Sequence, residues 1–311
     1  MQDSGGKEEQ AAPWVATSDD VTAIRTFREY FRLAKPRITL LIVISTAVGF
    51  CYGTRSAFNL LTLLHALLGT ALMAAGSATL NQWYERDLDA KMNRTRSRPI
   101  PSGAVPSRHA LLFGVALSVL GLLELWAFTD TLAAMLGLLT SVGYLFAYTP
   151  LKRKGPICTT IGAIPGAIPP LIGFAAACGH LGAEAWVLFG ILFLWQFPHF
   201  HAIAWIYRED YERAGIKMLA VVRPHGNALA VEILLTLLLL LPVTLAPAFL
   251  HMAGSVYFFV ALVLDLAFLY FGLQLSRQRI VERARRLLLA SVIYIPVLFA
   301  VLVFDNPRFP L

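Results

Sequence analysis

The sequence predicts an all-α polytopic membrane protein, with about nine transmembrane helices in a bundle around a central cavity. Of its 311 residues, 57% are hydrophobic and only 14% are charged, which is too apolar for an ordinary soluble domain. Its apolar runs approach the roughly 20 residues that a helix needs to cross a bilayer. These runs cover residues 38–54, 59–80, 109–128, 131–149, 157–177, 185–206, 228–250, 254–275 and 287–304.

The distribution of basic residues predicts the orientation of the chain. Most of the 26 Lys and Arg residues lie in alternate connections between the apolar runs. By the positive-inside rule these connections and the N-terminus are cytoplasmic, so the net charge of +7 reports topology and no nucleic acid is expected as a partner. Residues 1–24 lack the apolar core of a signal peptide and the acid-poor pattern of a transit peptide. We therefore expect a multi-pass protein of the bacterial plasma (inner) membrane, with its active site toward the cytoplasm.

The chain divides into one large membrane domain with short flanking segments. Before the first apolar run, apolar and basic residues alternate at helical spacing, which is typical of a helix lying in the membrane interface. The cations that close this helix, Lys35 and Arg37, are either contacts to a diphosphate or an ordinary positive anchor. The expected segments are a disordered N-terminal tail at 1–21, an interfacial amphipathic helix at 22–37, a single transmembrane domain at 38–304 and a short C-terminal tail at 305–311.

Polar residues concentrate between the second and third apolar runs. If the second run continues as helix, Asn81, Glu85 and Asp89 project from one face because they are four residues apart. Two carboxylates and an amide supply the oxygen ligands that Mg²⁺ prefers, and Mg²⁺ commonly bridges to substrate phosphates. Arg94 and Arg98 follow, and guanidinium groups match phosphate oxygens. The segment predicts a metal-bound diphosphate, and its alternative interpretation is a solvated face of topology-determining charges.

The connection after the fourth run is a second basic segment. The run ends near Tyr148, and Lys152 and Arg153 follow it. The fifth run then carries three prolines and four glycines within residues 162–179. A membrane helix with so many breakers is broken or bent, and its freed backbone must be packed in protein or line a cavity. We expect a cavity beside this run, although a kinked packing helix is the alternative.

Ionisable residues in the last turns of the sixth run form the third polar segment. His199 and His201 are two residues apart, so they point about 200° from one another and do not ligate one metal from the same side. Asp210 and Lys217 lie in the connection that follows. Asp265 stands alone in the eighth run, where it is either a substrate contact or a hydrogen-bonded structural acid.

These segments resemble the UbiA-type intramembrane prenyltransferases, whose first signature is N-x-x-x-D-x-x-x-D followed by R-x-x-x-R-P. In this chain the first acidic position is Glu85, and Tyr207 and Tyr211 stand at the ends of the second acidic pair of the quinone-type enzymes. Cys158 is a further departure. The chain resembles in particular the haem-modifying branch, the protohaem IX farnesyltransferases or haem O synthases. The supporting blocks are AKPRITLL, NQWYERDLDAKMNRTRSRPIPSG, YTPLKRKGP, GAIPGAIPPLIGF and WQFPHFHAIAWIYREDYERAGIKML.

The resemblance implies a prenyltransferase of haem biosynthesis that transfers the farnesyl group of farnesyl diphosphate to a vinyl group of haem b, giving haem O. Mg²⁺ would be the cofactor, and haem b a substrate. His199 or His201 would contact the haem or act as an acid–base group, with the choice left open. The metal ligands implied are Asn81, Glu85 and Asp89. The catalytic set adds Arg94, Arg98, Lys152, Arg153 and Asp210, and the other binding residues are Lys35, Arg37, Tyr148 and Lys217.

Three other functions stay open on the sequence. The first is a UbiA-type prenyltransferase acting on an aromatic quinone or chlorophyll precursor. The others are a membrane transporter and a haem chaperone, because broken helices and a midplane acid also suit substrate gating. The expected partners are farnesyl diphosphate, haem b and membrane lipid, with haem A synthase or a terminal oxidase as candidate protein partners.

Overall fold

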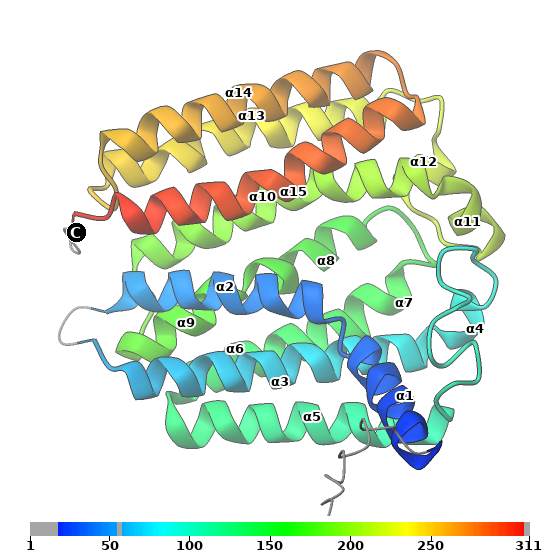
Figure 1. Ribbon diagram of the computed structural model, residues 1–311. Coiled ribbons are helices and arrows are strands. Elements are labelled where there is room, and N and C mark those ends of the chain that lie inside the picture. The colour runs from blue at the N-terminus through cyan, green and yellow to red at the C-terminus, as the bar shows by residue number, and fades with distance from the viewer. Residues whose placement is uncertain (1–17, 55–57, 308–311) are drawn as a thin grey trace, which may run out of the picture.

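The computed structural model describes residues 18–54 and 58–307, and within these residues the chain forms helices and turns without a strand. Nine helical segments in this part are long and apolar enough to cross a membrane, which confirms the predicted number (Figure 1). Four of them are α2 (Pro36–Gly53), α3 (Leu60–Tyr84), α5 (Ser107–Phe128) and α6 (Thr131–Val142), which continues through the π-helical turn η1 (Gly143–Tyr148) and α7 (Thr149–Leu151). The others are α8 (Cys158–Ala167) with α9 (Pro169–Cys178), α10 (Ala183–Ile206), α13 (Ala228–Phe249), α14 (Ser255–Arg277) and α15 (Val281–Phe304).

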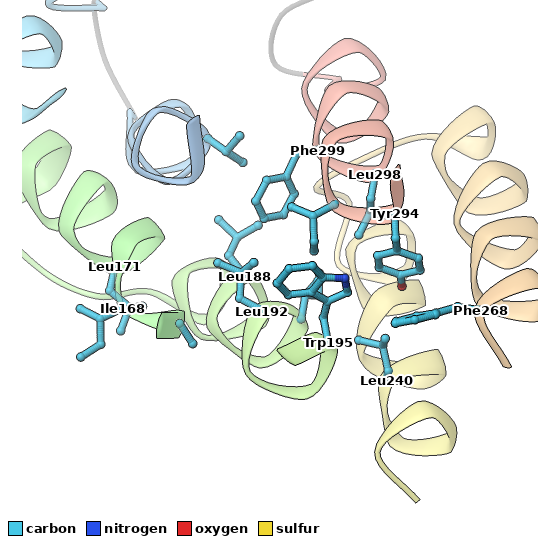
Figure 2. Close-up of a cluster of buried hydrophobic side chains, with 14 of the residues drawn as sticks. Ile168, Leu171, Leu188, Leu192, Trp195, Leu240, Phe268, Tyr294, Leu298 and Phe299 are labelled. Atoms are coloured by element: carbon cyan, nitrogen blue, oxygen red, sulfur yellow. The ribbon is translucent and has the colours of Figure 1, made fainter. Parts of the chain in front are cut away.

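The spanning helices pack in two groups that lie side by side in Figure 1. Helices α10, α13, α14 and α15 form one group, and α2, α3, α5, α6 and α9 form the other. Large apolar side chains fill the first group and its border with α9 (Figure 2). Leu188 and Trp195 of α10 lie beside Phe299 of α15, and the Trp195 indole donates a hydrogen bond to the Ser291 carbonyl at 2.9 Å. The buried indole N–H therefore has the partner that its position away from water requires.

Small residues bring the helices of the second group into close contact. A Cβ atom on Gly173 of α9 would lie 1.8 Å from the carbonyl oxygen of Thr46 in α2, and one on Gly49 would lie 1.9 Å from that of Pro170. Backbone therefore packs directly on backbone at this crossing. Close van der Waals packing matters here because lipid tails are as apolar as the side chains, so burial alone gives little drive for helix association.

The fifth span is broken, as its prolines and glycines predict. It consists of α8 and α9, which meet at Ile168, and most of the span is buried. Helix α9 packs directly against α2 through Gly49 and Gly173. The cavity described below is lined by none of the residues from Cys158 to Cys178, so the cavity expected beside this run stays a prediction.

Short helices and turns gather at one end of the bundle, opposite the C-terminal end of α15 (Figure 1). They are α1 (Ser18–Leu33), α4 (Arg86–Asp89), the turns at 90–106, α11 (Arg208–Arg213) and α12 (Leu219–Val222). The interfacial helix expected at 22–37 is shorter than predicted at its end, since α1 stops at Leu33 and α2 begins at Pro36. Most of the tail expected at 1–21 lies outside the described residues, but its last four belong to α1. In the tail expected at 305–311, residues 308–311 lie outside the described residues, and Asp305 accepts a hydrogen bond from the Tyr257 backbone at 2.7 Å.

Candidate active site

A cavity of about 430 Å³ lies at the end of the bundle where the short helices gather. Its lining contains both polar and apolar residues. The polar residues are Arg32, Lys35, Asn81, Gln82, Glu85, Asp89, Arg94, Arg98, Tyr144, Tyr148, Lys152 and Tyr211. The apolar residues are Ile38, Met92, Pro99, Phe200, Ile203, Ile216 and Met218.

The three predicted oxygen ligands Asn81, Glu85 and Asp89, here called the oxygen ladder, line this cavity. Helix α3 ends at Tyr84, but the four-residue bonding pattern crosses the junction, because the Glu85 amide donates to the Asn81 carbonyl at 2.9 Å and the Asp89 amide to the Glu85 carbonyl at 2.8 Å. Asn81, Glu85 and Asp89 therefore stay on one side of the chain, and all three are buried. The Asn81 amide also donates to Glu85 Oε2 at 3.0 Å.

Each carboxylate of the oxygen ladder contacts a cationic side chain. Lys152 Nζ lies 2.8 and 3.0 Å from the two carboxylate oxygens of Glu85, and Arg98 Nη1 lies 2.6 Å from Asp89 Oδ2. Burial works to raise the pKa of Glu85, but Lys152 outweighs it and holds that pKa below its ordinary value. Burial works to lower the pKa of Lys152, and Glu85 outweighs it in turn, so this pKa is raised. Both partners are therefore charged at neutral pH.

The donor set fits a hard divalent cation. Asp89 Oδ1 is buried and has no hydrogen-bond partner among the described residues, so it is free to accept a ligand bond. Asn81 Oδ1 faces donors, namely the Tyr144 hydroxyl at 3.2 Å and Lys35 Nζ at 3.4 Å. Residues 18–54 and 58–307 contain no group of three or more His, Cys, Asp or Glu side chains that would hold a metal by themselves. A metal here would thus need the Asn81 amide and further oxygens from water or substrate, which is how Mg²⁺ usually binds.

Lys35 reaches the cavity from a strained junction between α1 and α2. Its backbone is left-handed, with φ 47° and ψ 61°, a conformation that costs a residue other than glycine about 1–3 kcal/mol. The Gln82 side chain holds the junction by donating to the Leu33 carbonyl at 2.8 Å, and Arg32 holds α1 to the Ser97 carbonyl at 3.0 Å. Burial, together with the nearby Arg98 and Lys152, lowers the pKa of Lys35 to about 7.

Arg94 reaches the cavity from an exposed turn. Its guanidinium carbon lies 4.7 Å from the ring centroid of Tyr207 and 5.9 Å from that of Tyr211, and Nη2 donates to the Tyr211 hydroxyl at 3.4 Å. The backbone amide of Arg94 donates to Asp210 Oδ2 at 3.0 Å, and Asp210 also pairs with Arg213. The turn is therefore fastened to α11.

Residues 42–300 match the model of the UbiA prenyltransferase family. The chain belongs to this family. It is 51% identical to a protoheme IX farnesyltransferase of Solibacter usitatus, over 90% of this chain and 99% of that protein. Proteins with the same name from Koribacter versatilis and Aquifex aeolicus are 47% and 40% identical, over 90% and 89% of this chain and 93% and 95% of their own lengths.

Solved structures of other proteins share the fold. A digeranylgeranylglyceryl phosphate synthase gives a TM-score of 0.76 at 17% identity, covering 91% of this chain and 99% of that chain. A UbiA homologue from Archaeoglobus fulgidus bound to GPP and Mg²⁺ gives 0.63 at 21% identity, covering 88% and 99%. At these identities the likeness shows the fold alone. The family membership makes this chain a multi-pass membrane prenyltransferase.

The cavity does not gather every residue that the sequence predicts for the site. Lys35, Tyr148 and Lys152 line the cavity, whereas Arg37, Arg153 and Lys217 are exposed outside its lining. Asp210 also lies outside the lining, where its carboxylate accepts a hydrogen bond from the Arg94 backbone.

The two histidines of α10 also lie outside the cavity lining. His199 Nδ1 hydrogen-bonds to Ser291 Oγ of α15 at 2.7 Å. His201 is buried on another side of the helix, with Nε2 3.4 Å from the Glu232 carboxylate of α13. The prediction that the two side chains point in different directions is therefore confirmed. Neither side chain lines the cavity that contains the oxygen ladder.

Four polar residues of the cavity were not predicted as site residues from the sequence: Arg32, Gln82, Tyr144 and Tyr211. Tyr144 and Tyr148 have a signal in their four-residue spacing, and their rings stack at 5.4 Å between centroids. The π-helical turn that carries them has no comparable sequence signal, although such turns are frequent at functional sites. Arg32 enters the site through the packing of α1 on α3, where Gln82 of α3 donates a hydrogen bond to the Leu33 carbonyl.

Proposed function

We propose that this UbiA-family chain transfers the farnesyl group of farnesyl diphosphate to a vinyl group of protohaem IX, giving haem O. The observation that carries the proposal is a single cavity in which an oxygen ladder, five cationic side chains and an apolar wall meet. The choice of donor and acceptor is supported by the relatives named protoheme IX farnesyltransferase, which match the chain over about nine-tenths of its length.

The residues proposed to hold Mg²⁺ are Asn81, Glu85 and Asp89. When bound there, Mg²⁺ would neutralise charge on the diphosphate and make it a better leaving group. The unpaired Asp89 Oδ1 and the spacing of the three side chains support this assignment. The homologue described with GPP and Mg²⁺ supports a divalent cation of this kind in the fold.

Arg94, Arg98, Lys35 and Lys152 are proposed to bind the diphosphate oxygens. As the allylic C–O bond breaks, its electron pair leaves with the diphosphate, and fixed cations stabilise the charge that develops there. Removing one such fixed donor typically costs about 10²–10³-fold in rate. Tyr148 stiffens this group, because its ring lies 4.5 Å from Lys152 Nζ.

The apolar wall is proposed to hold the start of the farnesyl chain. Phe200 and Ile203 of α10 and Met218 of the following loop line the cavity, and Ile38 of α2 completes the wall. Such a surface excludes water from the allylic cation until the haem vinyl group attacks it, forming the new C–C bond. The oxygen of a water molecule then bonds to the resulting haem-side cation. Loss of one proton from that water leaves the hydroxyl of the hydroxyethylfarnesyl group.

The proposal also includes the orientation of the protein in the membrane and its protein partners. We place the cavity at the cytoplasmic side of a bacterial plasma membrane, where the basic connections lie. Haem A synthase or a terminal oxidase would receive the product. His199 and His201 are proposed haem contacts only if haem binds along α10 outside the described cavity, since neither residue lines it.

The test is conversion of haem b by the full-length protein purified in lipid nanodiscs, with farnesyl diphosphate and Mg²⁺, followed by mass analysis of the haem. We expect Asp89→Asn and Arg98→Ala to lose at least a hundredfold in rate. The matched controls Asp87→Asn and Arg96→Ala lie on the same segment but are exposed outside the cavity lining, and they should stay near wild type. Full activity in Asp89→Asn and Arg98→Ala would remove the assigned site, and prenylation of an aromatic acceptor in place of haem would refute the choice of acceptor.

A further inference from the structure

The carboxylates that line the cavity come from one side only. Glu85 and Asp89 follow α3, and they are the acidic residues of the described lining. The side contributed by α10, α11 and the loop after them presents Phe200, Tyr211 and Met218. A second divalent cation bound on this side would need oxygen ligands of its own, because Mg²⁺ is bound through carboxylates together with substrate phosphates.

Arg94 supplies a positive charge on this side of the cavity. Its guanidinium lies over the rings of Tyr207 and Tyr211, which are one helical turn apart across the start of α11. Asp210, between them, accepts a hydrogen bond from the Arg94 backbone, so the nearest acid on this side fixes the position of a cation. The tyrosine rings hold the guanidinium without neutralising its charge.

Arg94 differs from three of the other four cations of the cavity because it is not paired with a carboxylate. Lys152 and Arg98 contact the two carboxylates of the ladder, and Arg32 pairs with Glu29 at 2.8 Å. The fourth, Lys35, contacts the Asn81 amide oxygen at 3.4 Å. In the described part of the chain, the Arg94 guanidinium contacts Tyr207 and Tyr211 and forms no ion pair with a carboxylate. Its N–H donors are therefore available to a phosphate, which a guanidinium binds at two points.

We propose that Arg94, positioned by Tyr207 and Tyr211, binds the diphosphate opposite the oxygen ladder and makes a second divalent cation unnecessary, so that the site takes one metal ion for each diphosphate. This inference rests on the proposed function. The cavity lining carries five basic side chains and two carboxylates, and this excess of basic groups favours binding of an anionic diphosphate. A covalently attached cation also cannot dissociate with the product.

The first measurement is stoichiometry. The full-length protein in nanodiscs is titrated with Mn²⁺ at saturating farnesyl diphosphate, and free Mn²⁺ is counted by electron paramagnetic resonance. We expect one Mn²⁺ for each bound farnesyl diphosphate. A ratio of two would overturn the inference while leaving haem farnesylation intact, whereas absence of farnesyl diphosphate binding to the wild-type protein would overturn the proposed function as well.

The second measurement tests the tyrosines as positioning residues. Replacing both with Tyr207→Leu and Tyr211→Leu should raise the Kd for farnesyl diphosphate in Mn²⁺ about tenfold, the equivalent of about 1.4 kcal/mol. Tyr207→Phe keeps the ring and should bind like wild type, a rescue that a general loss of structure would not give. Tyr270→Leu, an exposed tyrosine of α14, is the matched control. An unchanged Kd in the double leucine variant would overturn the role of the ring pair.

Discussion

The ion pair between Lys152 and Glu85 gives the sharpest prediction about the site. Its side chains are only 13% and 7% exposed, and Nζ contacts both carboxylate oxygens. Lys152→Met leaves the Glu85 charge buried without its main partner, which typically costs 3–5 kcal/mol. At roughly 2–4 °C for each kcal/mol in a domain of more than 150 residues, the Tm should fall by on the order of 10 °C.

A second substitution separates the structural from the catalytic contribution of this pair. Glu85→Leu added to Lys152→Met removes both charges, so stability should return to near wild type because an apolar pair of similar volume avoids the desolvation cost. Activity should not return, since the proposed metal ligand and phosphate contact are both lost. The control Lys154→Met removes an exposed cation two residues away. The assay is thermal unfolding in nanodiscs, with haem farnesylation measured in parallel.

The same pair predicts how stability depends on pH. The pKa of Glu85 is lowered in the folded protein, so its contribution is complete above the ordinary glutamate pKa and is lost as the pH falls. The pKa of Lys152 is raised, so its contribution is complete below the ordinary lysine pKa and is lost as the pH rises. Between about pH 5 and 10 the pair should stabilise the fold fully. A single Lys152→Met variant as stable as wild type throughout this window would refute the reasoning.

Three further predictions concern packing, the eighth span and the metal. Gly173→Ala should sharply lower the yield of folded protein, because its Cβ would lie 1.8 Å from the Thr46 carbonyl, while Gly155→Ala, with open space around it, should fold normally in a detergent-stability screen. Asp265→Leu should lower the free energy of unfolding by about 1–3 kcal/mol, because the buried Tyr294 hydroxyl, 2.5 Å from Asp265 Oδ1, would lose its acceptor. An altered Kd for farnesyl diphosphate in this variant would contradict a purely structural role. Chelation with EDTA should abolish haem farnesylation and added Mg²⁺ should restore it, whereas activity that survives complete chelation would exclude the proposed metal.

The Asp265 prediction also bears on the functions that the sequence left open. The carboxylate is buried among α13, α14 and α15, where Tyr294 contacts it and Thr244 contacts Tyr294 at 3.0 Å. It is not part of the cavity lining. This placement favours the hydrogen-bonded structural acid over a substrate-gating acid of a transporter, since gating requires contact with the transported molecule.

The sequence by itself determined the membrane class, the nine spans and the oxygen ladder. These depend on local properties, namely the length of apolar runs and the four-residue repeat that places Asn81, Glu85 and Asp89 on one side. The broken fifth helix followed in the same way from its own prolines and glycines. Each of these features is decided by residues close together along the chain.

Only the tertiary structure decided which distant residues meet that ladder. Lys152 lies 67 positions from Glu85 in the sequence, and Tyr211 lies 117 positions from Arg94. It also turned His199 and His201 toward neighbouring helices and packed α9 directly on α2. Such pairings depend on how whole helices pack, and helix packing is fixed by side-chain shape at contacts far apart in sequence, which no local periodicity encodes.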